Sequence, residues 1–469
     1  MRLAAYLPRP PRVHANPVSD KQAMVESSPA VRTEDDLLAP FYEACKPASA
    51  WRIGTEAEKC GVYADGSAVP FEGERGIRAV LDALAKLGWE PHREVESGPV
   101  LSLTRAQASI TLEPGGQLEL SGAPLHTIHE TRAEMDAHLA EIRVIGDRLG
   151  IAWLGLGFHP FARREDLSFV PKLRYGVMRE YLPTRGAMGI DMMLRTCTVQ
   201  ANLDYASEDD AIRKLRVSMR LSPIVAAMFA NSPFVEKRAT GDRSHRTRVW
   251  LDVDPDRSGL LPFLWTGERM GFSRYVQWVL DCPMFMLKRD DRIVHNTGQT
   301  FRAFMKDGFG GTSATVDDWM THVNSMFPEV RLKRTLEMRS ADNQRGDLVC
   351  ALPAIWKGLL HDETALAKAE SLTSALTFDD AENAREPIAK HALRARLAGR
   401  DVSNWASDVL AIAEGGLERI ADLDLEGRDE RMHLAPLRAL VDRSDSPADV
   451  ALRAVGSDFV RDVIAATRL

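Results

Sequence analysis

The chain has 469 residues, of which 45% are hydrophobic and 27% are charged, close to the averages of folded globular proteins. This composition excludes collagen-like, coiled-coil and wholly disordered chains. The net charge of −7 disfavours a dedicated nucleic-acid binder, because such a protein needs a positive field to attract phosphates. No apolar run approaches the ~20 residues that a membrane helix needs. We therefore expect neither a nucleic-acid partner nor a membrane.

The cysteines and the first residues bear on the cellular location. Five cysteines are scattered without a C-x-x-C pair, so the sequence indicates neither a disulfide framework nor a thiolate zinc site and favours a reducing cytoplasm. Residues 1–35 are expected to be a disordered or mis-started tail, with Met24 as the true initiator. Several arginines in this tail leave an organellar transit peptide open, although Asp20 and Glu26 count against it.

Two amphipathic helices are predicted in the first third of the chain. Apolar residues recur every three or four positions over residues 77–87 and stop at Gly88, and a second such pattern over residues 135–149 stops at Gly150. Glycine directly after the last apolar position is a common helix end. Both helices should pack their apolar faces on other elements.

The composition changes after Leu348, where the chain becomes helical and rich in Ala, Leu, Asp and Glu. The clearest helical stretches there are residues 364–376 and 446–469. We expect them to cap the convex side or the rim of a sheet. The predicted organisation is a catalytic core over residues 36–361 and a helical region over residues 362–469 packed on it.

Four segments alternate polar and apolar side chains, which is the period of a β-strand. They are residues 51–58, 110–120, 196–204 and 330–339. Each predicts one strand, with a bulge or bend where a proline and two glycines interrupt the second segment at 114–116. Alternation alone indicates only an antiparallel sheet with one buried and one solvated face.

The polar faces of these segments carry more carboxylates and amides than a solvated surface needs. Two carboxylates on one strand face repel each other, and a divalent cation such as Mg²⁺, which prefers oxygen ligands, relieves that repulsion. We therefore expect an α+β fold in which one curved antiparallel sheet carries an acidic metal site on its concave face. The residues that meet on these faces are Glu56, Glu58, Glu113, Glu119, Gln200, Asn202, Glu337 and Arg339.

A basic edge lies beside the acidic residues. Arg331, Lys333 and Arg334 precede Glu337 and Arg339, and positive side chains beside an acidic metal site suit a bound polyphosphate such as ATP. Two simpler interpretations stay open, namely a solvated basic edge and an ordinary ion pair between Glu337 and Arg339.

Motifs of other nucleotide and hydrolytic sites are missing from the sequence. There is no G-x-x-x-x-G-K-[ST] loop, the glycines at 308–311 predict a mobile turn, and the Gly155 and Gly157 pair does not open a helix. Neither a G-x-S-x-G elbow nor a closely spaced Cys/His pair supports a covalent nucleophile. A structural role is favoured for His129 and His159, since no second ligand stands at zinc spacing. We expect direct transfer between bound substrates.

Five segments closely resemble the plant and proteobacterial type of glutamate-cysteine ligase. The likeness extends from about residue 36 to the end of the chain and is strongest up to residue 361. This family resembles glutamine synthetase in its catalytic sheet, which implies a funnel-like antiparallel active site that binds ATP, several Mg²⁺ ions and glutamate. The segments are residues 52–59, 112–124, 171–179, 191–204 and 327–339.

The resemblance implies a role for each matching residue. Gln200 and Asn202 would line the nucleotide and metal side, and Arg339, with Glu337 beside it, would face the transferred phosphate. Independently of the resemblance, the charge of the basic edge formed by Arg331, Lys333 and Arg334 favours contact with the nucleotide. The metal ligands would be Glu56, Glu58, Glu113, Glu119 and Glu337. The amino-acid and phosphate pockets would be shaped by Lys172, Arg174, Tyr175, Met178, Arg179, Arg246 and Arg257.

The implied reaction has two steps. ATP phosphorylates the γ-carboxylate of L-glutamate, and the amine of L-cysteine then displaces phosphate to give γ-glutamylcysteine, the first step of glutathione biosynthesis. Phosphoryl transfer depends mainly on positioning and charge neutralisation, so no covalent nucleophile is required. We expect a monomer or weak homodimer whose partners are these three small-molecule substrates.

One departure from the plant members is informative. They join two cysteines in a regulatory disulfide, whereas the corresponding positions here are Asn296 and approximately Gly311, so that thiol switch cannot form.

Three other functions stay open. A sister ligase with another amine acceptor would share every metal residue. A glycosidase would also use paired carboxylates, but it needs sugar-stacking aromatic side chains, and only 7% of the residues are aromatic. A non-catalytic amino-acid or nucleotide sensor is disfavoured, because the acidic set looks complete.

Overall fold

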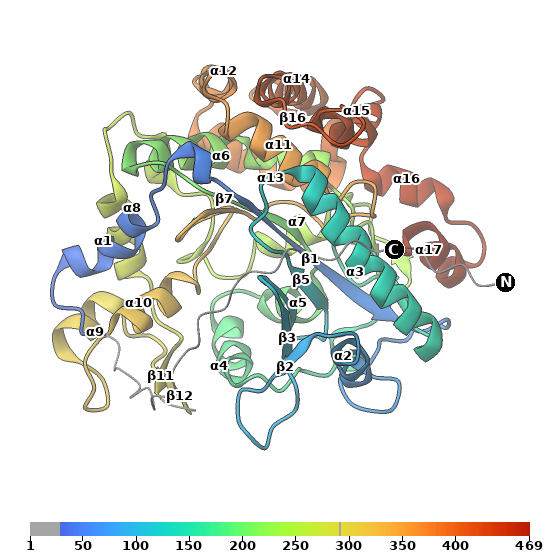
Figure 1. Cartoon of the computed structure of the whole chain (residues 1–469), viewed down its shortest axis with the longest axis horizontal. Coiled ribbons are helices and arrows are strands. Elements are labelled where there is room, and N and C mark those ends of the chain that lie inside the picture. The colour runs from blue at the N-terminus through green and yellow to red at the C-terminus, as the bar shows by residue number, and fades with distance from the viewer. Residues whose placement is uncertain (1–28, 290–291) are drawn as a thin grey trace.

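A nine-stranded antiparallel sheet crosses the centre of the computed structural model, which describes residues 29–289 and 292–469 (Figure 1). The strand order is β14-β15-β7-β1-β5-β4-β3-β2, and β6 pairs with the far end of β1. The expected α+β class with an antiparallel sheet is therefore confirmed. The strands are β1 (Ile53–Val62), β2 (Glu90–His92), β3 (Ser102–Arg105), β4 (Ala108–Leu112), β5 (Leu118–Ser121), β6 (Ala152–Leu154), β7 (Val199–Leu203), β14 (Val330–Leu332) and β15 (Leu336–Met338).

Strand β1 shows how alternation divides the sheet into two faces. Lys59 is buried on the helical side, where its Nζ lies 3.1 Å from Nε2 of His138 on helix α3 (Ile128–Leu149). Successive side chains of a strand point to opposite faces, so Glu56 and Glu58 lie on the other side. Helices thus cover one face, and the polar face is left for a site.

Residues 110–120 form two strands and not one bent strand. Strands β4 and β5 pair with Leu112 opposite Leu118, and the turn between them is closed by the Gly116 N–H, which donates to the Glu113 carbonyl at 2.9 Å. Gly116 has a φ of 84°, a left-handed conformation that glycine adopts without strain. The predicted bulge is therefore wrong, because the proline and glycines make a hairpin turn.

Residues 330–339 also form a hairpin, so the expected single strand is wrong. Strands β14 and β15 pair with Arg331 opposite Glu337, and Arg334 lies exposed at the tip. Opposed residues both have odd numbers, so the odd-numbered side chains still share one face. The even-numbered residues from 330 to 338 are apolar except Arg334, and its exposed position at the tip explains this exception.

The two helices predicted from apolar spacing are confirmed. Helix α2 (Ile77–Ala85) buries its apolar face, including Val80 and Leu81. Helix α3 begins with a capping box, in which Thr127 and Glu130 satisfy each other's backbone N–H groups, and it ends at Gly150 with a φ of 73°.

Helices cover the face of the sheet opposite the polar residues. Helix α6 packs on β14 and β15, α11 on β7, and α3 on β1 and β6, while α14 packs on α11 (Figure 1). One hydrophobic core extends across residue 361, and the boundary expected there stays a prediction. The remaining helices are α1 (Glu34–Glu43), α4 (Leu173–Tyr181), α5 (Gly189–Arg195), α6 (Glu208–Met228), α7 (His245–Trp250), α8 (Phe272–Asp281), α9 (Phe301–Asp307), α10 (Val316–Val323), α11 (Ala351–Leu360), α12 (Glu363–Thr373), α13 (Phe378–His391), α14 (Val402–Ile420), α15 (Ala435–Val441), α16 (Pro447–Ala454) and α17 (Phe459–Thr467).

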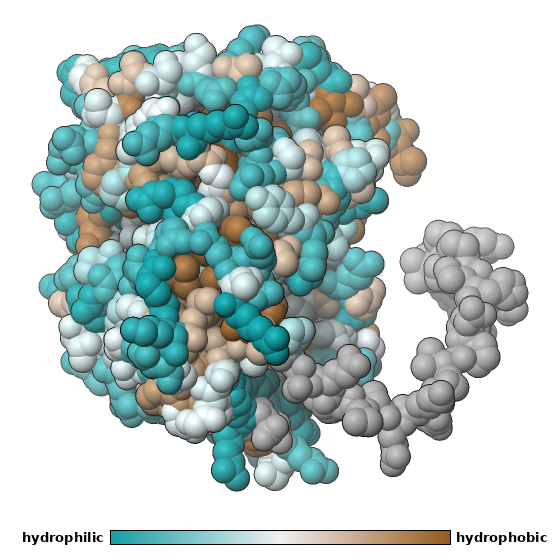
Figure 2. All heavy atoms as spheres, turned by 90° about the vertical axis from the view of Figure 1, so that its left-hand side faces the viewer, coloured by the Kyte–Doolittle hydropathy of each residue, from teal (hydrophilic) through white to brown (hydrophobic). Residues whose placement is uncertain are grey.

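The remaining strands form four small pairs outside the main sheet, and the predicted helical stretch 446–469 is divided between α16 and α17. None of the helices among the described residues combines the length and the apolar character that a membrane span needs. The face that carries α1, α8, α9 and α10 is mostly hydrophilic (Figure 2). The pairs are β8 (Phe234–Val235) with β9 (Arg238–Ala239), β10 (Ser258–Gly259) with β13 (Phe327–Pro328), β11 (Met286–Arg289) with β12 (Arg292–His295), and β16 (Arg396–Leu397) with β17 (Arg400–Asp401).

Candidate active site

A cavity of about 480 Å³ lies on the polar face of the sheet. Its floor comes from β1, β5, β7, β14 and β15, and its opposite wall comes from α4, α5, α7 and residues 321–327. Most residues that the sequence singled out meet in this one cavity. These are Glu56, Glu58, Glu113, Glu119, Arg174, Tyr175, Met178, Gln200, Arg246, Arg331, Lys333, Glu337 and Arg339.

Strand register brings the acidic residues of the floor together. Glu58 on β1 lies opposite Glu119 on β5, and Glu56 lies opposite Gln200 on β7. Residues opposed in this way have Cβ atoms only ~5 Å apart. The polar side chains from three strands therefore form a continuous patch.

Burial makes the carboxylates of β1 hard to ionise. It raises the pKa of Glu56 to about 7, and the charges of Glu337 and Glu119 add to the effect. Burial also raises the pKa of Glu58 well above its usual range, with further contributions from Glu113 and Glu119. A bound cation would stabilise the ionised form of both groups.

The environment of Glu337 favours its ionised form, unlike that of Glu56 and Glu58. Its carboxylate lies 2.6 Å from Arg331 Nη2, 2.5 Å from Lys333 Nζ and 2.9 Å from Arg339 Nη1. Burial alone would raise its pKa, but these three cations hold that pKa well below its usual range. Because the three cations already neutralise Glu337, its role as a metal ligand stays a prediction.

Arg339 is held at the cavity by its side chain and its backbone. Its Nη1 donates to Gln200 Oε1 and to Glu337 Oε2, both at 2.9 Å. Its carbonyl accepts a hydrogen bond of 2.8 Å from Arg246 Nη2. No described residue accepts a hydrogen bond from its Nε or Nη2, which leaves these donors available to a ligand.

Two predicted residues lie beside the cavity without lining it. Asn202 orients a floor residue, because its Nδ2 donates to Glu56 Oε1 at 2.8 Å. Lys172 stands at the start of α4, and its Nζ donates to the Leu112 carbonyl at 2.7 Å. Burial lowers the pKa of Lys172 to about 8.

Three predicted residues lie away from the cavity. Arg334 and Arg179 are exposed, Arg334 at the hairpin tip and Arg179 over the ring of Phe169. Arg257 is completely buried and pairs with Asp254 at 2.6 Å. Their contributions to nucleotide or substrate binding stay predictions.

Sequence reasoning identified Arg174, Tyr175, Met178 and Arg246 on the wall that faces the sheet, but it missed the rest of that wall. The missed part is rich in methionine and aromatic side chains that come from α5, from α7, from residues 285–286 at the start of β11 and from the segment around 321–327. These residues follow no common period, so no pattern in the sequence distinguished them from core residues. They include Met192, Met193, Trp250, Phe285, Met286 and Phe327.

The floor offers suitable chemistry for a hard cation, although not a complete cage. No group of three or more His, Cys, Asp or Glu side chains within the described ranges could hold a metal ion as placed. Mg²⁺ is usually bound by one or two carboxylates, with substrate phosphates and water completing its shell. Glu58 and Glu119, opposed and buried, fit that requirement.

Related proteins of known name cover most of the chain. A glutamate-cysteine ligase B of Oryza sativa subsp. japonica is 41% identical over 435 residues, which are 92% of this chain and 86% of that protein. A glutamate-cysteine ligase of Arabidopsis thaliana is 40% identical over 455 residues, 96% of this chain and 84% of that protein. The Brassica juncea enzyme is 43% identical over 411 residues, 87% and 78% respectively.

These relatives correct the expected location. All three are named as chloroplastic enzymes, and this finding contradicts the cytoplasmic location inferred from the cysteine pattern. An absence of disulfide spacing indicates a reducing environment, and it does not distinguish one reducing compartment from another.

A solved structure shares the fold. The glutamate-cysteine ligase of Francisella tularensis in complex with AMP superposes with a TM-score of 0.54 and 12% identity, covering 89% of this chain and 87% of that one. At the level of sequence, residues 52–464 match the glutamate-cysteine ligase family 2 (GCS2). Together with relatives of about 41% identity, this match shows that the chain belongs to the glutamate-cysteine ligase family 2.

Proposed function

We propose that this chain is an ATP-dependent glutamate-cysteine ligase. It would join the γ-carboxylate of L-glutamate to the amine of L-cysteine through γ-glutamyl phosphate, releasing ADP and phosphate. Family membership and the names of the relatives support this reaction.

The observation that carries the proposal is the distribution of charge in the cavity. The carboxylates of β1 and β5 occupy one part of the floor, and Arg331, Lys333 and Arg339 occupy the part next to it. A nucleotide triphosphate with its cation needs both kinds of group within one site.

Arg339 suits the role of the cation at the transferred phosphoryl group. Gln200 and Glu337 fix one of its nitrogens, and its Nε and Nη2 are free to donate to phosphoryl oxygens. Donors held in place in this way stabilise charge that develops in the transition state without a further cost of reorganisation.

Neither step of the reaction requires a nucleophilic side chain from the protein. An oxygen of the γ-carboxylate attacks the γ-phosphorus of ATP, and the bond from that phosphorus to the ADP oxygen breaks. The cysteine amine then attacks the acyl carbon, phosphate leaves with the bonding electrons, and the nitrogen loses a proton. The chain's part is to hold both substrates in reach and to neutralise charge.

Four carboxylates are proposed as Mg²⁺ ligands, namely Glu56, Glu58, Glu113 and Glu119. The ion would neutralise phosphate charge when bound. Arg174 and Arg246, which line the same cavity, are proposed to meet the carboxylates of the amino-acid substrates, and Tyr175 and Met178 to shape their pocket.

The apolar wall is proposed to exclude water from the acyl phosphate. Met192, Met193 and Phe327 face the floor across the cavity and offer no hydrogen-bonding side-chain group strong enough to order an attacking water.

An assay of ADP release tests the function. The purified chain is given ATP, Mg²⁺, glutamate and one of a panel of amino acids, and the product is identified by mass spectrometry. We expect rapid release with cysteine and a product with the mass of γ-glutamylcysteine. Preference for another amine would identify a sister ligase, and an absence of ADP release with every acceptor would contradict the proposal.

A further inference from the structure

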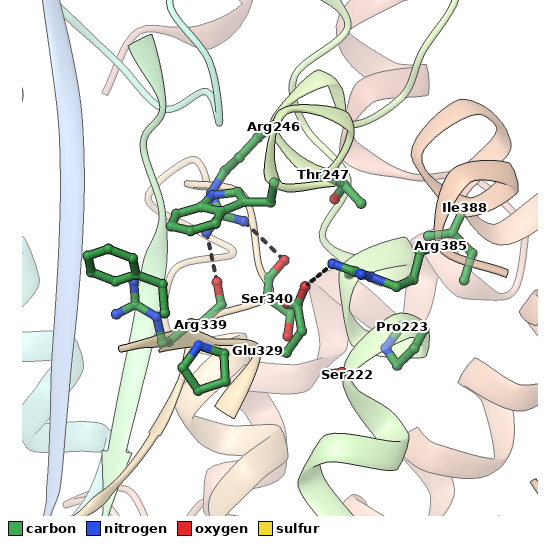
Figure 3. Close-up of a pocket in the computed structure, with 13 residues that line it drawn as sticks. Ser222, Pro223, Arg246, Thr247, Glu329, Arg339, Ser340, Arg385 and Ile388 are labelled. Atoms are coloured by element: carbon green, nitrogen blue, oxygen red, sulfur yellow. Dashed lines mark hydrogen bonds and ion pairs between the residues drawn. The ribbon is translucent and has the colours of Figure 1, made fainter. Parts of the chain in front are cut away.

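A second, small cavity of about 20 Å³ lies behind Arg339 (Figure 3). Arg246, Trp250, Phe327 and Arg339 line both cavities and therefore form the wall between them. On its far side the small cavity is closed by residues of α6 and α13, among them Arg385. The helical C-terminal part of the chain thus reaches the back of the active site.

Arg385 joins helix α13 to the segment before β14. Its Nη2 lies 3.0 Å from Glu329 Oε1, and the two side chains are only 9% and 18% exposed (Figure 3). Its Nη1 donates to Glu382 Oε1 at 3.0 Å. The guanidinium is closely confined, because a Cβ at Gly259 would lie 3.2 Å from Nη1.

Glu329 in turn holds the backbone of Arg339. The Arg339 N–H donates to the Glu329 carbonyl at 3.1 Å, and the Glu329 N–H donates to the Gly259 carbonyl at 3.0 Å. On the other side, Arg246 donates to the carbonyls of Arg339 and Ser340 (Figure 3). The peptide groups on both sides of the Arg339 Cα are therefore anchored, and one of the two anchors depends on Glu329.

We propose that the Arg385–Glu329 ion pair positions Arg339 for phosphoryl transfer and so makes catalysis depend on the C-terminal helices. The inference rests on the function proposed above for Arg339. Loss of the pair lets the backbone of Glu329 move, and Arg339 moves with it. A small displacement of a group that acts in the transition state lowers turnover more than it lowers substrate binding.

Three variants test the pair, namely Arg385→Gln, Glu329→Gln and the double variant. We expect each single change to lower kcat roughly 10-fold while the KM values for ATP and glutamate stay within about 2-fold. Because the two residues act through one contact, the double variant should lose about as much as one single variant. Losses that multiply to about 100-fold would show that the two residues act independently, and the proposal would be wrong.

Arg213→Gln is the matched control. It breaks the ion pairs that Arg213 on α6 forms with Glu363 at 2.6 Å and with Glu370 at 2.9 Å on α12, and none of these residues lines the two cavities. We expect this variant to keep its kcat even where its melting temperature falls as far as that of Arg385→Gln. Equal kcat values in the two variants would overturn the proposal.

Two further variants keep the outcome clear. Arg385→Lys preserves the positive charge and should retain most of the turnover that Arg385→Gln loses, and equal losses in both would contradict a role for the ion pair. Arg339→Lys distinguishes the catalytic role proposed for Arg339 from the positioning role proposed for the Arg385–Glu329 ion pair. If it turns over normally, the role proposed for Arg339 is wrong, whereas its failure beside a fully active Arg385→Gln overturns only the positioning role.

Discussion

Glu58 and Glu119 lie directly opposite each other on neighbouring strands of the sheet, and each side chain is only 8% exposed. Like charges that lie directly opposite each other on neighbouring strands destabilise the strand pair. Burial and neighbouring carboxylates raise the pKa of Glu58 well above its usual range, which is a further sign that the ionised pair needs a cation. The arrangement is costly for the fold alone, and the divalent ion proposed above would relieve that cost when bound.

Glu58→Gln should therefore abolish most of the turnover and leave the fold intact. The amide removes a ligand charge, and it also removes the repulsion with Glu119, so the melting temperature without Mg²⁺ should stay the same or rise. Steady-state kinetics and thermal melts with and without Mg²⁺ measure both effects. Near-normal activity at saturating Mg²⁺ would contradict the assignment of Glu58 as a metal ligand.

Activity should change little between strong reductant and mild oxidant, provided that the substrate cysteine is kept reduced. All five cysteines are unpaired, and burial raises the pKa values of Cys282 and Cys350 to about 12. A thiol with such a pKa is rarely ionised and reacts slowly with oxidants. A large, reversible loss of activity that disappears on replacing Cys282 or Cys350 would reveal an unforeseen switch.

Stability should fall as the pH is lowered from about 6.5, in part because of His322. This histidine is buried, its Nε2–H donates to the Val279 carbonyl at 2.9 Å, and burial lowers its pKa to about 3. Between pH 6.5 and pH 3 this histidine binds a proton in the unfolded chain but not in the folded chain. The stability that neutral His322 contributes is therefore complete above pH 6.5 and is lost as the pH falls. At pH 5 the loss is about 2 kcal/mol.

Urea unfolding at pH 5 and pH 7.5 measures this loss for the unmodified chain and for His322→Gln. The variant should be less stable at neutral pH, but it should lose less stability on acidification. Replacement of the exposed His391 by Gln is the control and should leave the pH dependence unchanged. Parallel pH dependence in all three proteins would rule out His322 as a source.

Alternation predicted the polar face of the sheet better than it predicted the strands. Arg331 and Glu337 were expected on one face of a single strand, and they lie on one face of a hairpin. In this hairpin, odd-numbered residues lie opposite odd-numbered residues. A two-residue period therefore looks the same for a single strand and for the hairpin. The turn depends on Lys333 and Thr335, whose backbone groups form a 2.9 Å hydrogen bond that no periodicity reveals.

The apolar part of the opposite wall, formed by Met192, Met193, Trp250, Phe285, Met286 and Phe327, could not be predicted from the sequence. Its methionines and aromatic residues come from elements that are distant along the chain and meet only through tertiary packing. The ion pair between Arg385 and Glu329 is a similar case, because its partners are separated by 56 positions, one on helix α13 and the other in the segment before β14. Local patterns indicate which face of an element is polar, and they do not indicate which elements face each other.

Arg339→Lys distinguishes catalysis from simple ion pairing. Lysine keeps the charge and can still approach Glu337, which has Arg331 and Lys333 as further partners, so the fold should keep its melting temperature. Lysine lacks the planar fork, so it cannot bind Gln200 and Glu337 and still offer two donors to a phosphoryl group. Loss of such a contact costs ~3–4 kcal/mol, or about 10²- to 10³-fold in kcat.

Measurement of kcat and melting temperature for this variant decides between the two roles. Arg396→Lys is the control, because Arg396 is exposed on the small β16–β17 pair and does not line the cavity, and this change should leave both values unchanged. A low kcat with an unchanged melting temperature supports Arg339 as the phosphate-facing cation. If Arg339→Lys instead keeps most of its activity and melts at a lower temperature, Arg339 serves the structure of the hairpin through Glu337.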